Sequence, residues 1–131
     1  MKALDTNVLL RYLVEDDPVQ ARQAARIIED ARRREEQLFL PLLVICETVW
    51  VLSRRYRQAR SVIAEGLEQI LETDIFLVEQ ADVVRTCLTR FRSGKGSFPD
   101  YVIGAVAEQA GCSITVTFDQ DLEGSGGFQV L

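Results

Sequence analysis

The chain has 131 residues, of which 47% are hydrophobic, and a formal net charge of −5 at pH 7. We expect a single domain, residues 1–131, because this length supports one well-buried core. No apolar run reaches the roughly 18 residues of a membrane span, so we expect a soluble protein. Histidine is absent, which excludes Ser-His-Asp and Cys-His nucleophile systems and histidine-ligated zinc sites.

The first expected element is a strand at Lys2–Leu4, a short apolar run that ends at a turn-forming aspartate. Val8–Leu13 suits a short helix. Asp17 and Pro18 mark the start of a longer helix, since an N-cap residue is followed by proline at the first helical position. Apolar residues then recur at helical spacing up to an arginine run at 32–34.

The same alternation continues in the middle of the chain. Leu38–Leu40 is expected to form a second strand, and Pro41 to open a helix that reaches about Tyr56. Ser61 should cap the next helix, which carries one apolar face. A third strand is expected at Ile75–Val78.

The last third of the chain begins with an expected helix over 81–91 and a glycine-rich loop over 93–97. Pro99 should start a helix that Gly111 ends in the left-handed conformation. Strands at 114–117 and 128–131 complete the chain. Strands separated by helices predict an α/β fold, with a mostly parallel central sheet covered on both faces in three α/β/α layers.

The three cysteines, Cys46, Cys87 and Cys112, are isolated and form no C-x-x-C pair. Since no signal peptide or regular cysteine framework is seen, we expect reduced, partly buried thiols in a cytoplasmic protein. The chemistry that remains is that of carboxylates, whose hard oxygens suit Mg²⁺ or Mn²⁺ rather than zinc or copper.

The net negative charge argues against a nucleic-acid-binding protein, which usually carries a basic face. The basic residues are nevertheless unevenly spread, with clusters within 32–34, 54–60 and 85–95. For each cluster a solvated helix face is the simpler interpretation, and a basic rim around an acidic metal site is the alternative.

Four acidic residues lie where expected strands end or helices begin: Asp5, Glu47, Asp100 and Asp119. Ligands bind outside the carboxyl ends of the strands in open α/β sheets, so all four are expected to converge on one edge of the sheet. Glu47 is the strongest single signal, because it interrupts an apolar stretch where a carboxylate needs a metal or a cation as partner. An ion pair with an arginine is the main alternative for Glu47.

The other three acids also have simpler structural interpretations. Asp5 can bond backbone N–H groups in an Asx turn, and Asp100 can complement a helix N-terminus. Asp119 lies in a polar turn that can be exposed to solvent. The hypothesis of a metal site therefore rests on the set and not on any one member.

The four acids lie in motifs that occur in order along the chain: Leu4–Leu9, Pro41–Leu52, Phe98–Ala107 and Thr115–Leu122. In these motifs the chain resembles PIN domains, and most closely the ribonuclease toxins of bacterial toxin–antitoxin pairs, the VapC family. Each motif is short, but the set spans nearly the whole chain. One departure is Tyr101, which follows Asp100 where family members often have alanine, and it affects the shape of the pocket.

The resemblance implies an Mg²⁺- or Mn²⁺-dependent endoribonuclease that cleaves RNA phosphodiester bonds, is inhibited by a cognate antitoxin protein and forms a homodimer. Clustered carboxylates repel one another and favour a divalent cation, which activates water and clamps the scissile phosphate. Asp5 and Asp100 would be the principal ligands, and Glu47 and Asp119 would hold metal-bound waters or a second ion. The supporting residues would be Thr6, Asn7 and Thr117, whose hydroxyl and amide groups can fix the carboxylates.

Three other classes of protein compete with this hypothesis. A receiver-type phosphoacceptor needs a lysine at the end of a pocket strand, but the only lysines are Lys2 and Lys95. A phosphatase of the haloacid dehalogenase type needs Asp-x-Asp-x-Thr after the first strand, where this chain has Asp5–Leu9. A non-catalytic PIN-like RNA-binding or interaction module remains as the alternative.

Overall fold

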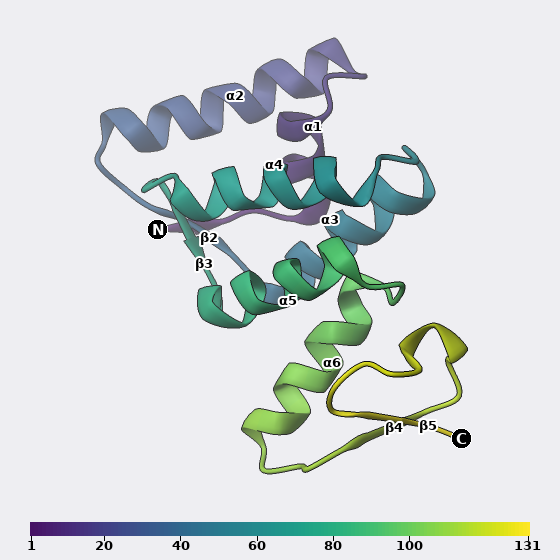
Figure 1. The fold of residues 1–131 in the computed structure, drawn as a ribbon. Coiled ribbons are helices and arrows are strands. Elements are labelled where there is room, and N and C mark those ends of the chain that lie inside the picture. The colour runs from purple at the N-terminus through teal and green to yellow at the C-terminus, as the bar shows by residue number, and fades with distance from the viewer.

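The computed structural model describes residues 1–131 and places a three-stranded parallel sheet in the N-terminal part of the protein (Figure 1). Its strands are β1 (Lys2–Ala3), β2 (Leu38–Leu40) and β3 (Phe76–Val78), in the order β1-β2-β3. Lys2 lies opposite Leu38, and Leu38 lies opposite Phe76. The central strand β2 is the most buried, because it has a neighbouring strand on each side.

The structure has six α-helices: α1 (Thr6–Leu13), α2 (Pro18–Arg33), α3 (Leu42–Arg54), α4 (Arg60–Glu72), α5 (Ala81–Ser93) and α6 (Phe98–Gln109). Helix α1 packs against α2 and α3, α4 packs against α5, and α6 packs against both α5 and α3. Their apolar faces form one connected core that reaches from Leu4 to Leu122. None of the helices has the length and apolar character needed to cross a membrane.

Local signals in the sequence set several of these boundaries. The carboxylate of Asp17 accepts a hydrogen bond from the N–H of Gln20, so the predicted capped start of α2 is confirmed. Gly111 follows α6 with φ of +95°, which confirms the left-handed end. The predicted cap at Ser61 is wrong, since α4 begins at Arg60 and has no side-chain cap.

Hydrogen bonds from Arg60 to residues distant in the sequence explain this earlier start of α4. Its guanidinium donates to the carbonyl oxygens of Phe91 at 3.0 Å, Gly96 at 2.7 Å and Lys95 at 2.8 Å. It also lies over the ring of Phe91, 4.6 Å from the centroid. The first turn of α4 is thus anchored to the loop before α6 by a charged side chain instead of by a local cap.

Replacing Arg60 should therefore be costly. We expect Arg60→Ala to lower the free energy of unfolding by roughly 2–3 kcal/mol, because three carbonyls lose hydrogen bonds to a charged donor. Arg92→Ala is the matched control, since Arg92 pairs only with Glu68 at the surface and should cost under about 1 kcal/mol. Urea denaturation of both variants makes the comparison. Equal losses would show that the anchoring role assigned to Arg60 is wrong.

The predicted α/β class and parallel strand pairing are confirmed, but the strands are divided between two sheets. Strand β4 (Thr115–Thr117) pairs in parallel with β5 (Phe128–Val130), and the short 3-10 helix η1 (Gln120–Leu122) lies between them. Figure 1 shows this second sheet beyond α6, away from β1, β2 and β3. The expected single sheet is therefore not formed within one chain.

Buried side chains hold the second sheet in this position. Phe98 and Tyr101 anchor the first turns of α6 in the core, with 1% and 2% of their surface exposed. Leu122 of η1 is equally buried and packs beside Gly96, where a Cβ would lie 2.6 Å from a Leu122 methyl carbon. The ring of Phe128 packs in the same close manner against Gly104 of α6. The β4–β5 sheet thus follows α6 as one unit.

Candidate functional site

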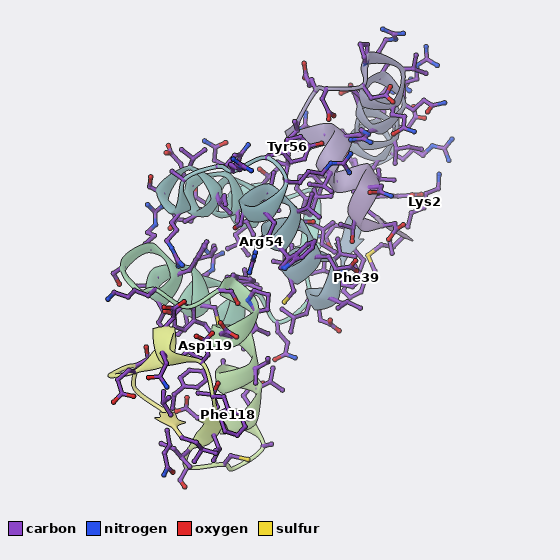
Figure 2. All side chains as sticks on the ribbon, turned by 90° about the vertical axis from the view of Figure 1, so that its right-hand side faces the viewer. Lys2, Phe39, Arg54, Tyr56, Phe118 and Asp119 are labelled. Atoms are coloured by element: carbon purple, nitrogen blue, oxygen red, sulfur yellow. The ribbon has the colours of Figure 1, made fainter.

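The four acidic residues that the sequence singled out lie in two groups. Asp5 and Glu47 belong to the part of the molecule that contains β1, β2 and β3, whereas Asp100 and Asp119 lie together in a cavity near the start of α6. In Figure 2, Lys2 of β1 and Asp119 lie in different parts of the molecule, with Arg54 between them.

Asp5 links the end of β1 to the start of α1. Its backbone is extended, with φ of −80° and ψ of 162°, and its Oδ1 accepts a hydrogen bond from the N–H of Thr6 at 2.8 Å. The carboxylate is exposed and so remains accessible to a ligand. The Thr6 hydroxyl beside it is buried without a hydrogen-bond partner. Asp5 thus bonds a backbone N–H, as its simpler interpretation expected, although as the N-cap of α1 and not in an Asx turn. Its second carboxylate oxygen stays free.

Glu47 is exposed, so the expectation that it would be a buried carboxylate is wrong. Its neighbours one turn away, Leu43 and Trp50, are themselves 68% and 54% exposed. The core-facing side of α3 is formed by other residues, namely Val44, Ile45, Thr48, Val49 and Leu52. Glu47 forms none of the ion pairs in the structure, and the alternative of a structural pair with arginine is therefore wrong as well.

Asp100 forms a reciprocal capping box with Ser97 at the start of α6. Its Oδ2 accepts from the N–H of Ser97 at 2.9 Å, and the Ser97 hydroxyl accepts from the N–H of Asp100 at 3.3 Å. The helix-capping interpretation is therefore realised here too. The box also fixes the orientation of the carboxylate, which lines the cavity.

Asp119 lies at the turn between β4 and η1. Its Oδ1 accepts from the N–H of Asp121 at 2.9 Å, and its own N–H donates to the Thr117 hydroxyl at 3.0 Å. The side chain of Thr117 therefore holds the turn that carries Asp119. Asp119 is exposed, as the simpler interpretation of this turn required.

The cavity that holds Asp100 and Asp119 has a volume of about 510 Å³. Asp121 also lines it, and the opposite charge comes from Arg54, Arg60 and Lys95. Arg60 is committed to backbone carbonyls, whereas Arg54 and Lys95 are exposed and make no ion pair. These two cations can bind phosphate oxygens beside the carboxylates. Asp121 was not predicted, and its only sequence signal is its closeness to Asp119. Arg54 and Lys95 belong to two of the basic clusters for which a rim around an acidic site was the alternative interpretation.

A metal ion needs several of these donors around one point. The carboxylates have the right chemistry for Mg²⁺ or Mn²⁺, but no three acidic or cysteine side chains lie together in a way that could hold a metal ion. Asp5 and Glu47 do not line the cavity of Asp100 and Asp119. A single chain in this arrangement therefore does not fit the metal site that the sequence predicted.

The cysteines take no part in the cavity. All three are free, and burial raises the pKa of both Cys46 and Cys87 to about 11, which keeps them protonated at neutral pH. Cys112 is exposed, against the expectation that it would be partly buried, because it lies in the turn after Gly111. No thiolate chemistry is therefore assigned to the site.

A model of the PIN domain matches residues 2–125 of the chain. The chain belongs to the PIN domain family. It is also similar to a curated protein named VapC ribonuclease from Aquifex aeolicus (strain VF5), with 33% identity over 119 residues, 90% of this chain and 87% of that protein. The match to the PIN domain contains all four acidic residues and spans both the β1-β2-β3 sheet and β4. Both groups of acids therefore belong to the same PIN domain.

Proposed function

We propose that this PIN domain protein is an endoribonuclease that depends on Mg²⁺ or Mn²⁺ and hydrolyses RNA phosphodiester bonds as the toxin of a toxin–antitoxin pair. The observation that carries the proposal is the 33% identity with the VapC ribonuclease over 90% of this chain. It is supported by Asp5, Glu47, Asp100 and Asp119, each of which lies within the matched region.

The proposed roles follow from how each side chain is held. The principal metal ligands would be Asp5 and Asp100, although they do not line one cavity within a single chain. Each is oriented by a backbone hydrogen bond that leaves one carboxylate oxygen free. Glu47 and Asp119 are exposed, and they would hold metal-bound waters or a second ion. The bound ion would lower the pKa of a water molecule and neutralise charge on the phosphate.

The substrate of the proposed reaction is RNA with exposed bases, either a single strand or a folded loop. Arg54 and Lys95 would bind backbone phosphates on either side of the scissile bond, because both are exposed and unpaired at the rim of the carboxylate cavity. The net charge of −5 argues against nucleic-acid binding, but this local pair of cations offers RNA a positive surface beside the carboxylates. Cleavage should accordingly weaken as the salt concentration rises.

The proposed partner is a cognate antitoxin that acts in the cytoplasm together with this protein. An inhibitory segment should place an arginine or lysine near the carboxylates, because an acidic pocket without its metal attracts a cation. A non-catalytic PIN-like RNA-binding or interaction module is the second candidate. It is favoured by the separation of the two acid groups within one chain.

The proposal is tested by incubating purified protein with single-stranded and structured RNA. We expect cleavage with Mg²⁺ or Mn²⁺, none in excess chelator, and no rescue by Ca²⁺ alone, because its looser coordination positions a nucleophile poorly. Gel analysis of end-labelled RNA measures the products. RNA binding without cleavage at any metal concentration would favour the non-catalytic module, and cleavage that persists in chelator would contradict the metal requirement.

A further inference from the structure

Each of the two sheets has a free edge that ends next to an acidic residue. Strand β1 is bonded on one side only, to β2, and Asp5 follows it after one residue. Strand β4 is bonded on one side only, to β5, and Asp119 follows it after one residue. An open strand edge carries unpaired N–H and C=O groups and is a template for another strand.

The hydrogen bonds inside each sheet define which backbone groups face the free edges. The N–H of Leu4 donates to Phe39, so in a parallel ladder the N–H and C=O of Ala3 point away from β2. The N–H of Thr115 donates to Gly127, and Thr117 accepts from Leu131, so both residues face β5. The N–H and C=O groups of Val116 and Phe118 therefore point to the free edge of β4.

These orientations restrict how the two edges can pair. In a parallel ladder, a residue whose N–H and C=O point towards the neighbouring strand lies opposite a residue whose N–H and C=O point away from the first strand. Ala3 can therefore lie opposite Thr117, with hydrogen bonds to Val116 and Phe118. In that register Leu4 lies opposite Phe118, and Asp5 lies opposite Asp119. One pairing thus satisfies both edges and brings together the two acids that follow them.

The β4–β5 sheet also has an apolar face that nothing covers. Its other face packs on α6 through Phe128 and is half-buried. The open face carries Phe118, which is 81% exposed, and also Ile114, Val116 and Leu131. Parallel sheets are normally covered on both faces, and two strands alone are marginally stable. In the register above, this face continues the side of β1 on which Leu4 is buried.

The partner for β1 cannot be its own β4 unless the present packing is broken. Within one chain, moving β4 onto β1 would pull Leu122 out of the core and carry α6 with it, since Phe128 is packed against Gly104. The β4–β5 unit of a second copy can reach β1 with these contacts intact. Two copies can do so reciprocally, which gives a closed dimer with two-fold symmetry.

We propose that a second copy of this chain completes the active site by adding its β4–β5 unit to the free edge of β1. Each site then combines Asp5 and Glu47 of one chain with Asp100 and Asp119 of the other, since the latter two share one cavity. The dimer contains two five-stranded sheets in the order β3-β2-β1-β4-β5. The strand exchange rests on the structure alone, and the role of the assembled acids rests on the proposed function.

Cysteine cross-linking tests the strand exchange without relying on activity. Ala3→Cys and Thr117→Cys are placed in separate chains that also carry Cys112→Ser, which removes the exposed thiol. Neighbouring strands lie within the Cα separation that a disulfide bridges, about 4.4–6.8 Å. After co-expression and mild oxidation, we expect a disulfide-linked species of twice the chain mass. Leu43→Cys paired with Thr117→Cys is the matched control and should not link.

The double variant Ala3→Cys/Thr117→Cys distinguishes strand exchange, in which β1 pairs with β4 of a second copy, from closure, in which β1 pairs with β4 of its own chain. Exchange gives linked dimers on a non-reducing gel, whereas closure gives a linked monomer and overturns the proposal. A chain that is monomeric in light scattering and forms no link in either experiment also overturns it. These outcomes hold whether or not the protein cleaves RNA, so a failure of the exchange is distinct from a failure of the proposed function.

Complementation then tests whether the shared site is catalytic. Asp5→Asn and Asp119→Asn are each expected to be inactive, but a dimer that contains one of each has one intact site. Tandem purification with two different tags should yield about half of the parent cleavage rate, because one of two symmetric sites is restored. Asp5→Asn combined with Glu47→Gln should restore nothing, since both acids come from the same chain. The shared site would be overturned if both mixed dimers recovered cleavage equally. It would also be overturned if neither recovered cleavage while the parent protein is active.

Discussion

Asp5→Asn should reduce RNA cleavage by more than about 100-fold, the upper effect expected for the loss of an outer-shell partner of a metal ligand. It should do so without destabilising the metal-free protein. Asparagine caps a helix as well as aspartate does, so the bond to the Thr6 N–H is kept. Removing one of several like charges from the assembled site should leave the free energy of unfolding unchanged or raise it.

Metal binding gives the same substitution a second measurement. Mn²⁺ at a hundredfold excess over its dissociation constant should stabilise the parent protein by roughly 2.7 kcal/mol, and Asp5→Asn should lose most of that gain. Thermal unfolding with and without Mn²⁺ measures it. Asp16→Asn is the matched control, since Asp16 pairs with Arg11 and Tyr56 and does not line the cavity of Asp100 and Asp119. It should keep both cleavage and the Mn²⁺ response.

The Asp5 result also separates a metal ligand from a simple helix cap. Asp5→Ala removes the cap as well as the charge, so it should lower the stability of the metal-free protein by about 1 kcal/mol. If Asp5→Asn retained cleavage while Asp5→Ala lost it through unfolding, Asp5 would be a cap only. A parent protein that showed no response to Mn²⁺ would remove the metal site from the proposal.

Phe98→Ala should produce the largest loss of stability, about 3–5 kcal/mol, since it leaves a cavity where a buried aromatic ring packs. Phe98 is 1% exposed and makes an edge-to-face contact with Phe91, with ring centroids 6.2 Å apart. It lies two residues before Asp100, at the first position of α6. Urea denaturation at fixed protein concentration measures the loss. Val106→Ala, a half-exposed aliphatic position on the same helix, should cost under about 1 kcal/mol.

The position of Phe98 gives this prediction a consequence for the site. Because Phe98 anchors the turn that holds the capping box, its truncation should weaken cleavage even under conditions where the variant is folded. Phe98→Leu keeps most of the buried apolar surface and should recover a large part of both properties. A Phe98→Ala protein as stable as the parent would contradict the packing described for α6.

Features that depend on neighbours along the chain were predicted correctly from local sequence signals. The pair Asp17 and Pro18 predicted the start of α2 because a cap and a proline act within one turn. Gly111 predicted the end of α6 for an equally local reason, its access to positive φ. The order and spacing of the acidic motifs indicated the PIN domain family, which the match over residues 2–125 confirms.

Features that depend on contacts between distant parts of the chain became visible only in the folded protein. The apolar letters around Glu47 suggested burial, but Leu43 and Trp50 lie on the exposed side of α3 together with it. Ser61 had the chemistry of a cap, yet the carbonyls that Arg60 binds lie more than 30 positions away. Neither the exposure of Glu47 nor the start of α4 at Arg60 can be predicted from local composition, since each depends on how distant parts of the chain pack.

The division of the strands into two sheets is the clearest case of this kind. Alternating strands and helices predict parallel pairing, but they do not determine which chain supplies the partner of an edge strand. That choice depends on where Leu122 and Phe128 pack, and both hold β4 and β5 beside their own α6. The four acids were therefore identified from the sequence, but tertiary packing leaves Asp5 and Glu47 outside the cavity that Asp100 and Asp119 line within one chain.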